Sequence, residues 1–249
     1  MESKNEKIII TGAASGFGSF LVDYLKARVN KLFLIDINEH GLRKFSGAAN
    51  VDLFHCDLTD YEQTTSVIKE IYEKEPETNV LINNAGLIHS ELLINFFNRQ
   101  DRRHSKDNWD RMLNVNLTSV FNCSVNVVDN MVRNKVKGLI INISSISANG
   151  NSGQSVYSAA KAGVNALTVS WSRELCLFGI RTAGIAPGFF DTPSTHIALK
   201  ENTVKKIISE IPSKRLGQLA ELAKAVEFII ENDYFNGKIL EIDGGMVLS

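Results

Sequence analysis

The N-terminal segment constrains the fold of this chain most strongly, because it joins a buried strand to a helix through a glycine-rich turn. Ile8-Ile9-Ile10 is a β-branched apolar run of the kind found in central strands of parallel sheets. It is followed by Thr11-Gly12-Ala13-Ala14-Ser15-Gly16-Phe17-Gly18, and an amphipathic segment typical of a helix begins near Gly16. Such a turn aims backbone N–H groups and a helix N-terminus at a pyrophosphate. The segment therefore predicts a dinucleotide-binding α/β fold.

Strand and helix patterns alternate along the rest of the chain. We expect strands near residues 7–11, 32–36, 51–55, 79–83, 138–143, 181–185 and 238–242, and helices near residues 16–28, 60–74, 107–134, 155–178, 195–209 and 218–231. This alternation predicts a seven-stranded parallel sheet with helices on both faces. With 249 residues, 44% of them hydrophobic, the chain can bury one large core, so we expect a single-domain Rossmann fold over residues 1–249.

Composition and charge argue against several kinds of partner. A formal net charge of −1 gives no reason to expect nucleic acid or an acidic membrane. No apolar run is long enough to span a membrane, and the polar N-terminus lacks the apolar core of a signal peptide. Cys56, Cys123 and Cys176 are in no metal-ligand spacing and are interpreted as reduced packing residues. We therefore expect a cytoplasmic protein with a small-molecule substrate and no metal site.

Asp36 indicates which dinucleotide binds. It ends a second apolar strand and lies 18 residues after Gly18, close to where a carboxylate contacts the adenosine ribose in dinucleotide-binding folds. It can accept hydrogen bonds from both ribose hydroxyls, whereas its charge would repel a 2′-phosphate. Ser15 in the glycine loop and Ile37-Asn38 after the acid provide no basic side chain for that phosphate. The segment therefore predicts NAD rather than NADP.

Tyr157 and Lys161 are the strongest candidates for a catalytic pair. They are four residues apart in an expected helix and so share one of its faces. An ammonium beside a phenol favours the phenolate, and we expect Lys161 to lower the pKa of Tyr157 from about 10 toward neutral pH. A tyrosine tuned in this way can exchange a proton with an alcohol or carbonyl oxygen. Such spacing is common in helices, and the glycine-rich N-terminal segment is what favours the catalytic interpretation.

Six motifs in a fixed order relate the chain to a known family. They are Thr11 to Gly18, Asp57-Leu58, Asn83-Asn84-Ala85-Gly86, Asn114-Val115-Asn116-Leu117, Ile143-Ser144-Ser145 with Tyr157 and Lys161, and Pro187-Gly188 with Thr192 beyond. With these motifs the chain resembles the short-chain dehydrogenases/reductases over essentially its whole length. The resemblance implies an NAD-dependent oxidoreductase that transfers a hydride between nicotinamide and an alcohol or ketone carbon.

The resemblance also implies roles for individual residues. The implied catalytic set is Asn116, Ser145, Tyr157 and Lys161. Tyr157 is then the general acid/base, Lys161 also holds the nicotinamide ribose, and Ser145 stabilises charge on the substrate oxygen. Asn116 would anchor a water that relays protons to Lys161. Cofactor contacts are expected at Gly12, Ser15, Phe17, Gly18, Asp36, Asp57, Leu58, Asn84, Gly86, Tyr157, Lys161, Pro187, Phe190 and Thr192, and substrate contacts at Ser145, Gln154 and Tyr157.

The position of the catalytic serine is open between two neighbours. In the family this serine usually lies 13 residues before the tyrosine, which is the position of Ser144. The strand pattern from Leu139 to Ser145 instead aligns Ser145 with the catalytic position and deletes one residue from the following loop. We predict that Ser145 is the catalytic serine.

The sequence indicates the type of reaction more clearly than the identity of the substrate. Gly179-Ile180-Arg181, the loop from Ile185 to Pro193 and the C-terminal region resemble short-chain 3-hydroxyacyl-CoA dehydrogenases and 3-oxoacyl reductases. Two arginines with which the reductases dock a carrier protein fall here on Val136 and Phe178, which disfavours a carrier-bound substrate. A 3-hydroxyacyl thioester is therefore expected. Polyol, steroid or secondary-metabolite alcohols, or a non-catalytic NAD-binding regulator, are the alternatives.

Two further features concern the surface of the protein. The segment between Gly86 and Asn116 is longer than in minimal family members, and its polar, basic residues 95–106 are expected to form either a lid or a solvated excursion. Helices 107–134 and 155–178 carry more apolar residues than one sheet face needs. The family commonly uses these two helices in a dimer and its last strand in a tetramer. We therefore expect a homotetramer, with a homodimer as the alternative.

Overall fold

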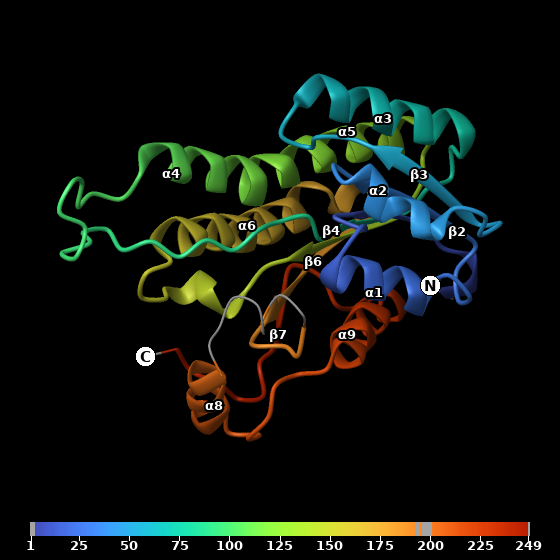
Figure 1. Cartoon of the computed structure of the whole chain (residues 1–249). Helices are drawn as coiled ribbons and strands as arrows, with labels where there is room; N and C mark the ends of the chain where they lie inside the picture. Colours follow the sequence, from blue (N-terminus) through green and yellow to red (C-terminus); the bar gives the residue numbers. More distant parts are fainter. Residues whose placement is uncertain (1–2, 193–194, 196–200, 249) are drawn as a thin grey trace.

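The computed structural model describes residues 3–192, 195 and 201–248. Within them, one parallel sheet has the strand order β3-β2-β1-β4-β5-β6-β7 (Figure 1). Its strands are β1 (Lys7–Thr11), β2 (Lys31–Asp36), β3 (Val51–His55), β4 (Val80–Asn83), β5 (Gly138–Ile143), β6 (Ile180–Pro187) and β7 (Ile239–Ile242). The order reverses between β1 and β4, which is where open α/β sheets bind their ligands. The predicted Rossmann fold with seven parallel strands is confirmed.

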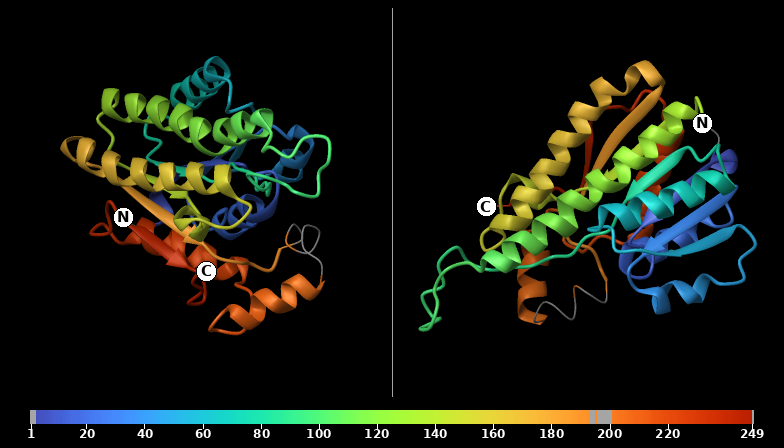
Figure 2. Two further views of the ribbon diagram at one scale, coloured as in Figure 1. Left: turned by 90° about the vertical axis from the view of Figure 1, so that its left-hand side faces the viewer. Right: turned by 90° about the horizontal axis from the view of Figure 1, so that it is seen from above.

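Helices cover both faces of the sheet (Figure 2). One face packs against α1 (Gly16–Leu25) and α9 (Leu219–Glu231), and the other against α3 (Tyr61–Lys74), α5 (Ser119–Arg133) and α6 (Ser155–Glu174). The strand residues alternate between the two cores: Ile8 and Ile10 face α1, whereas Ile9 faces α3 and α5. All three isoleucines are fully buried, which explains the continuous apolar run.

The remaining helices are short and lie near the ends of the strands. They are α2 (Glu39–Leu42), α4 (Lys106–Leu113), α8 (Glu201–Glu210), a π-helix at Asn114–Thr118, and 3₁₀ turns at Ser3–Asn5, Arg43–Phe45, Ile146–Asn149 and Cys176–Phe178. The expected helix 107–134 is therefore divided into α4, the π-helix and α5. Part of the expected helix 195–209 lies outside the described residues, and α8 covers its remainder.

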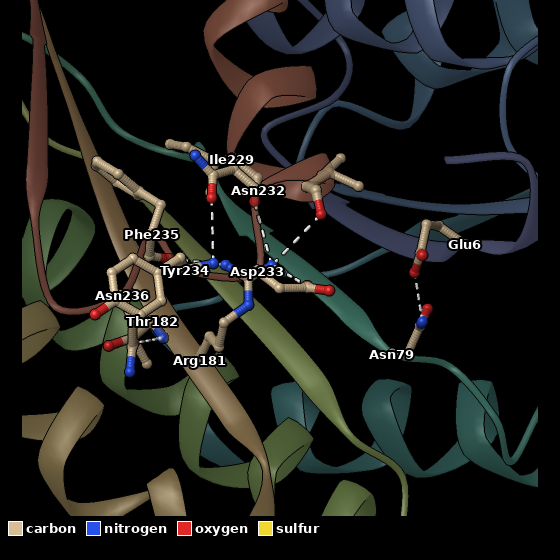
Figure 3. A network of polar contacts seen from close by, with 11 residues as sticks. Glu6, Asn79, Arg181, Thr182, Ile229, Asn232, Asp233, Tyr234, Phe235 and Asn236 are labelled. Carbon is tan, nitrogen blue, oxygen red and sulfur yellow. Dashed lines mark hydrogen bonds and ion pairs between the residues drawn. The ribbon is translucent and has the colours of Figure 1, made fainter. Parts of the chain in front are cut away.

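A polar network joins α9 to the amino-terminal ends of the strands, opposite the ligand-binding edge (Figure 3). The Arg181 guanidinium in β6 donates to the carbonyl oxygens of Phe235 (2.8 Å) and Ile229 (3.2 Å) and pairs with Asp233 at 3.3 Å. The last carbonyls of a helix have no partners within it, so this side chain caps α9 from the neighbouring sheet. Nearby, the buried Glu6 carboxylate accepts a hydrogen bond from the Asn79 amide.

Candidate active site

A cavity of about 1390 Å³ opens at the carboxyl ends of the strands. The predicted site residues that line it are Gly12, Ser15, Phe17, Asp36, Asp57, Leu58, Asn84, Gly86, Asn116, Ser145, Gln154, Tyr157, Lys161, Pro187, Phe190 and Thr192. Segments that are far apart in the sequence thus contribute to one site, because parallel strands end at a common edge.

Gly18 is the predicted cofactor residue that does not line the cavity. A Cβ atom there would lie 2.1 Å from the carbonyl oxygen of Gly12 and 2.6 Å from Asn84 Nδ2. No real side chain tolerates such contacts, so Gly18 allows α1 to pack closely against the loop that precedes it. A cofactor contact at Gly18 stays a prediction.

The glycine-rich loop forms a cradle for an anion. Gly12 and Gly16 have φ values of 66° and 52°, a left-handed conformation that glycine adopts without strain. Gly16 borders the cavity, and a Cβ atom added to it would meet no atom within 4 Å. It begins α1, whose N-cap residue Ser15 makes no side-chain capping bond. The first turn of α1 therefore presents its N–H groups at the cavity, which suits a pyrophosphate.

Asp36 lies at the far end of the same cavity, where the end of β2 meets the glycine loop. Its Oδ2 accepts a hydrogen bond from Ala14 N (2.9 Å), and its Oδ1 accepts one from Asn38 N (2.8 Å). These bonds orient the carboxylate and leave it lone pairs for further donors. Lys44, which the sequence analysis overlooked, donates to Ala14 O (2.8 Å) on the same loop, although it does not line the cavity.

Asn84 connects the glycine loop to the end of β4. Its Nδ2 donates to the carbonyl oxygens of Thr11 (3.0 Å) and Gly12 (3.1 Å), and its backbone N donates to Thr11 Oγ1 (3.0 Å). Because both amide hydrogens are used within the protein, Asn84 shapes the loop that cradles a ligand. Its position explains why the motif spans the carboxyl end of a central strand.

Tyr157, Ser145 and Lys161 meet at the centre of the cavity. The Tyr157 side chain is buried, and the Ser145 hydroxyl is near enough to oppose the rise of its pKa. Lys161 Nζ donates to the carbonyl oxygen of Ile143 (2.8 Å) and lies 5.8 Å from the centre of the Tyr157 ring. Burial lowers the pKa of Lys161 to about 8, since removal from water disfavours the ammonium.

The expected effect of Lys161 on Tyr157 does not occur in this structure. Burial raises the pKa of Tyr157 above its ordinary value, and the hydrogen bond from Ser145 only partly opposes that rise. The reason is geometric, because the ammonium of Lys161 points at a backbone carbonyl of β5 rather than at the phenol oxygen. The structure therefore contradicts the prediction of a lowered tyrosine pKa.

The two candidate serines occupy different environments. Ser144 is buried, and its Oγ donates to the carbonyl oxygen of Lys161 at 3.3 Å. Ser145 Oγ instead accepts a hydrogen bond from Ser147 N (3.1 Å) and contacts Tyr157. The arrangement brings Ser145 rather than Ser144 to the phenol, as the strand alignment predicts.

Asn116 lies in the π-helix between α4 and α5. Its Nδ2 donates to Met112 O (3.0 Å), and its Oδ1 accepts a hydrogen bond from Leu87 N (3.1 Å). A Cβ atom on Gly86 would lie 2.8 Å from Asn116 Oδ1 and 3.6 Å from Lys161 Nζ. Gly86 thus keeps the space between these two side chains open, which explains a glycine at that position.

Gln154 is held by three polar side chains in the wall of the cavity, two from its own β5–α6 connection and one from the segment after β4. Its Oε1 accepts hydrogen bonds from Ser147 Oγ and Asn151 Nδ2, both at 3.0 Å, and its Nε2 donates to Ser90 Oγ at 3.3 Å. Ser90, Ser147 and Asn151 line the cavity but belong to no motif, so sequence reasoning did not find them.

The long segment after β4 is a hairpin that extends beyond α4, away from the body of the molecule (Figure 2). Asn95 N donates to Arg102 O (2.7 Å), and His104 N donates to Leu93 O (3.0 Å). Phe97, near its tip, is 95% exposed. This segment therefore corresponds to the second of the two expected alternatives, an excursion into solvent, although its base is fixed to the cavity wall.

Glu91 holds the base of this hairpin. Its backbone N donates to Gly153 O (2.7 Å), and its carboxylate accepts hydrogen bonds from Asn108 Nδ2 and Ser105 N, both at 3.0 Å, and contacts His89 Nε2 at 3.1 Å. These donors, led by Asn108, lower the pKa of Glu91 to about 2. The carboxylate thus joins the hairpin to α4, and the backbone of Glu91 joins it, through Gly153, to the loop carrying Gln154.

Two negative findings apply to the described part of the chain. Its histidine, cysteine, aspartate and glutamate side chains form no group of three that could hold a metal ion. Its helices include none long and apolar enough to cross a membrane.

Comparison with known proteins agrees with this geometry. A family model described as short chain dehydrogenase matches residues 6–203. The chain is 34% identical over 256 residues to 3-oxoacyl-[acyl-carrier-protein] reductase FabG of Thermotoga maritima, and 33% identical over 253 residues to that of Escherichia coli K12, each match covering 100% of both chains. A solved structure of a candidate gluconate dehydrogenase from Agrobacterium tumefaciens has the same fold, with a TM-score of 0.88 and 22% identity over 98% of this chain and 97% of that one. The chain therefore belongs to the short-chain dehydrogenase/reductase family.

Proposed function

We propose that the protein is an NAD(H)-dependent oxidoreductase that interconverts a ketone and a secondary alcohol, with a 3-oxoacyl or 3-hydroxyacyl thioester as substrate. One observation carries the proposal: Tyr157 and Ser145 line the same cavity as the glycine-rich loop and Asp36. A proton donor and a dinucleotide cradle in one cavity suit hydride transfer coupled to proton transfer.

The residues divide the chemistry with the cofactor. Bound nicotinamide supplies or accepts the hydride at its C4 atom. During reduction the phenol of Tyr157 gives its proton to the carbonyl oxygen, while Ser145 stabilises the charge that develops there. The ammonium of Lys161, which donates to the Ile143 carbonyl, would hold the nicotinamide ribose with its remaining N–H groups. Asn116 Oδ1 retains a lone pair for a water that returns a proton toward Lys161.

The cofactor contacts follow from the shape of the cavity. The first turn of α1 would hold the pyrophosphate, Asp57 and Leu58 would border the adenine, and Asp36 would accept the ribose hydroxyls. Asp36 supports NAD because its charge opposes a 2′-phosphate. Pro187, Phe190 and Thr192, in the loop after β6, would close the nicotinamide side.

A thioester substrate is supported by two observations. The curated relatives named above are 3-oxoacyl-[acyl-carrier-protein] reductases by their names. Gln154, Ser90 and Asn151 also provide amides and a hydroxyl on the substrate side of the cavity, where they could bond polar atoms beyond the reacting carbonyl.

The assembly and location are also proposed. We infer a cytoplasmic homotetramer whose first interface is formed by α5 and α6, because Phe121 and Val125 on α5 are 47% and 37% exposed. Cys56 and Cys123 are buried free thiols, as expected in a reducing compartment.

The test is an absorbance assay for NADH with 3-oxoacyl-CoA esters, polyols and steroid ketones as a panel. We expect turnover with the thioesters, and loss of most turnover in Tyr157→Phe with unchanged NADH affinity, because only the phenolic proton is removed. Turnover restricted to polyols or steroids would refute the substrate class. NADH binding without turnover of any substrate would favour a regulator.

A further inference from the structure

A chain of buried polar side chains crosses the core directly behind the candidate active site. Asn83, at the end of β4, donates its amide to Asn142 Oδ1 in β5 (2.8 Å) and to Ser124 Oγ in α5 (3.0 Å). Asn142 in turn donates to Thr168 Oγ1 in α6 at 2.9 Å. Asn142 and Thr168 are fully buried. Because burying amides costs free energy that apolar side chains avoid, polar groups in this place suggest a purpose beyond packing.

Among these buried polar side chains, Thr168 uses its hydroxyl both as an acceptor and as a donor. Its Oγ1 accepts the bond from Asn142 and donates to the carbonyl oxygen of Val164 at 2.8 Å. Its backbone carbonyl accepts a hydrogen bond from Thr182 Oγ1 in β6 at 2.6 Å. A valine has nearly the same shape as threonine but could make neither hydroxyl contact.

The contact between Asn142 and Thr168 continues a row of contacts made by Lys161. Lys161 and Thr168 are seven residues apart, so they lie on the same face of α6. Lys161 Nζ bonds the carbonyl of Ile143, the residue after Asn142, and its own carbonyl accepts the hydroxyl of Ser144. The strand bearing Ser145 and the helix bearing Tyr157 are therefore joined at three successive positions.

We propose that Asn142 and Thr168 are positioning residues of the oxidoreductase reaction: they fix the spacing of β5 and α6, and thereby the placement of Ser145 against Tyr157 and Lys161. Neither residue touches the cavity, so both act through the residues they hold. The inference rests on the proposed function. A displacement of the reacting groups by about 1 Å can lower the rate a hundredfold, so two residues that fix the spacing of β5 and α6 can affect catalysis without contacting the substrate.

The experiment compares the same threonine-to-valine substitution at two buried positions. Thr168→Val should lower kcat by about tenfold or more, with the KM for NADH and for the thioester changed less than about twofold. Thr168→Ser restores the hydroxyl and should recover most of kcat. Thr78→Val is the matched control, because Thr78 is equally buried and its hydroxyl also bonds a carbonyl, that of Glu75, but at the opposite edge of the sheet. It should leave kcat unchanged.

Hydrogen exchange provides a second measurement that does not need turnover. Amide exchange in residues 143–147 should accelerate by about fivefold or more in Thr168→Val and stay unchanged in Thr78→Val. Equal effects of the two valine variants on both kcat and exchange would overturn the proposal, as would failure of Thr168→Ser to recover. An inactive wild-type protein would refute the proposed function alone. The exchange data would still decide whether Asn142 and Thr168 hold β5 against α6.

Discussion

At the scale of single residues, the adjacent serines after β5 show how one step along a strand changes the neighbours of a side chain. Both serines follow the last residue of β5 and contact the same helix, but Ser144 donates to the backbone of α6 at Lys161, whereas Ser145 lies beside the Tyr157 side chain. Sequence spacing favours Ser144 and the strand pattern favours Ser145. The observed contacts agree with the strand pattern, because the turn after the strand absorbs the missing residue.

The first prediction compares these serines. Ser145→Ala should lower kcat by about a hundredfold or more, since it removes a donor to the substrate oxygen, whereas Ser144→Ala should change kcat by less than about fivefold. Steady-state kinetics with NADH and a 3-oxoacyl-CoA ester measure both values. A larger loss in Ser144→Ala would contradict the assignment of Ser145 as the catalytic serine.

The second prediction concerns Asp36 and cofactor choice. A 2′-phosphate beside this carboxylate should cost several kcal/mol, so kcat/KM should favour NADH over NADPH by on the order of a hundredfold or more. Asp36→Ala combined with Ile37→Arg should narrow or reverse the ratio, because the like charge is removed and a cation is added. Equal use of the two cofactors by the unmodified protein would contradict the NAD assignment and point to Lys44 as the group that offsets the charge.

At the scale of elements, the hairpin after β4 and the end of α9 are held by single charged side chains. Glu91 gathers three donors at the base of the hairpin, and Arg181 caps α9 from a neighbouring strand. Charge-assisted hydrogen bonds are stronger than neutral ones, so one carboxylate or one guanidinium can fix a whole segment. The first segment borders the substrate, and the second lies at the opposite edge of the sheet.

The third prediction is that Glu91→Gln weakens substrate binding. Loss of the charge weakens the bonds from Asn108 and Ser105, so the cavity wall carrying Ser90 and Gln154 should loosen and the KM for the thioester should rise about three- to tenfold. Asp101→Asn is the control, because that carboxylate bonds only Arg103 within the hairpin. An unchanged substrate KM in Glu91→Gln, or an equal rise in the control, would refute the role.

The fourth prediction is that Arg181→Met lowers the free energy of unfolding by about 2–3 kcal/mol, because buried helix carbonyls lose a charged donor. Arg133→Met, which removes an exposed helical ion pair with Asp129, should cost less than about 1 kcal/mol. Urea unfolding at one fixed protein concentration measures both. Similar values for the two variants would show that the cap on α9 contributes little.

At the scale of the whole molecule, one layer of helices is left with apolar side chains on its outer surface. The sheet-facing sides of α5 and α6 are buried, yet Phe121 and Val125 remain partly exposed on α5. Apolar side chains gathered on the outer face of a helix pair favour association with a second copy through the same surface.

The fifth prediction is a homotetramer of about 110 kDa, four times the 27.6 kDa chain, by light scattering at micromolar concentration. Phe121→Glu should yield smaller species, because a charge would be buried in the interface. Tyr234→Glu, at a side chain that is 99% exposed outside these helices, should leave the mass unchanged. A stable monomer in the unmodified protein would contradict the proposed assembly.

The sequence by itself determined the sheet, the glycine-rich loop and the motif residues that line the cavity. Their signals are local: Ile8-Ile9-Ile10 needs burial on both faces, Gly12 and Gly16 need left-handed backbone, and Tyr157 and Lys161 need one helix face.

Only the tertiary structure decided which groups the charged and polar side chains contact within this fold. Lys161 points at a β5 carbonyl, so burial rather than its charge dominates the pKa of Tyr157. Gly18 packs against Gly12 rather than facing the cavity, and Lys44 reaches the glycine loop from a distant turn. These outcomes depend on which groups the folded chain brings within a few ångströms. No local pattern contains that information, because desolvation and hydrogen bonding depend on neighbours that are distant in sequence.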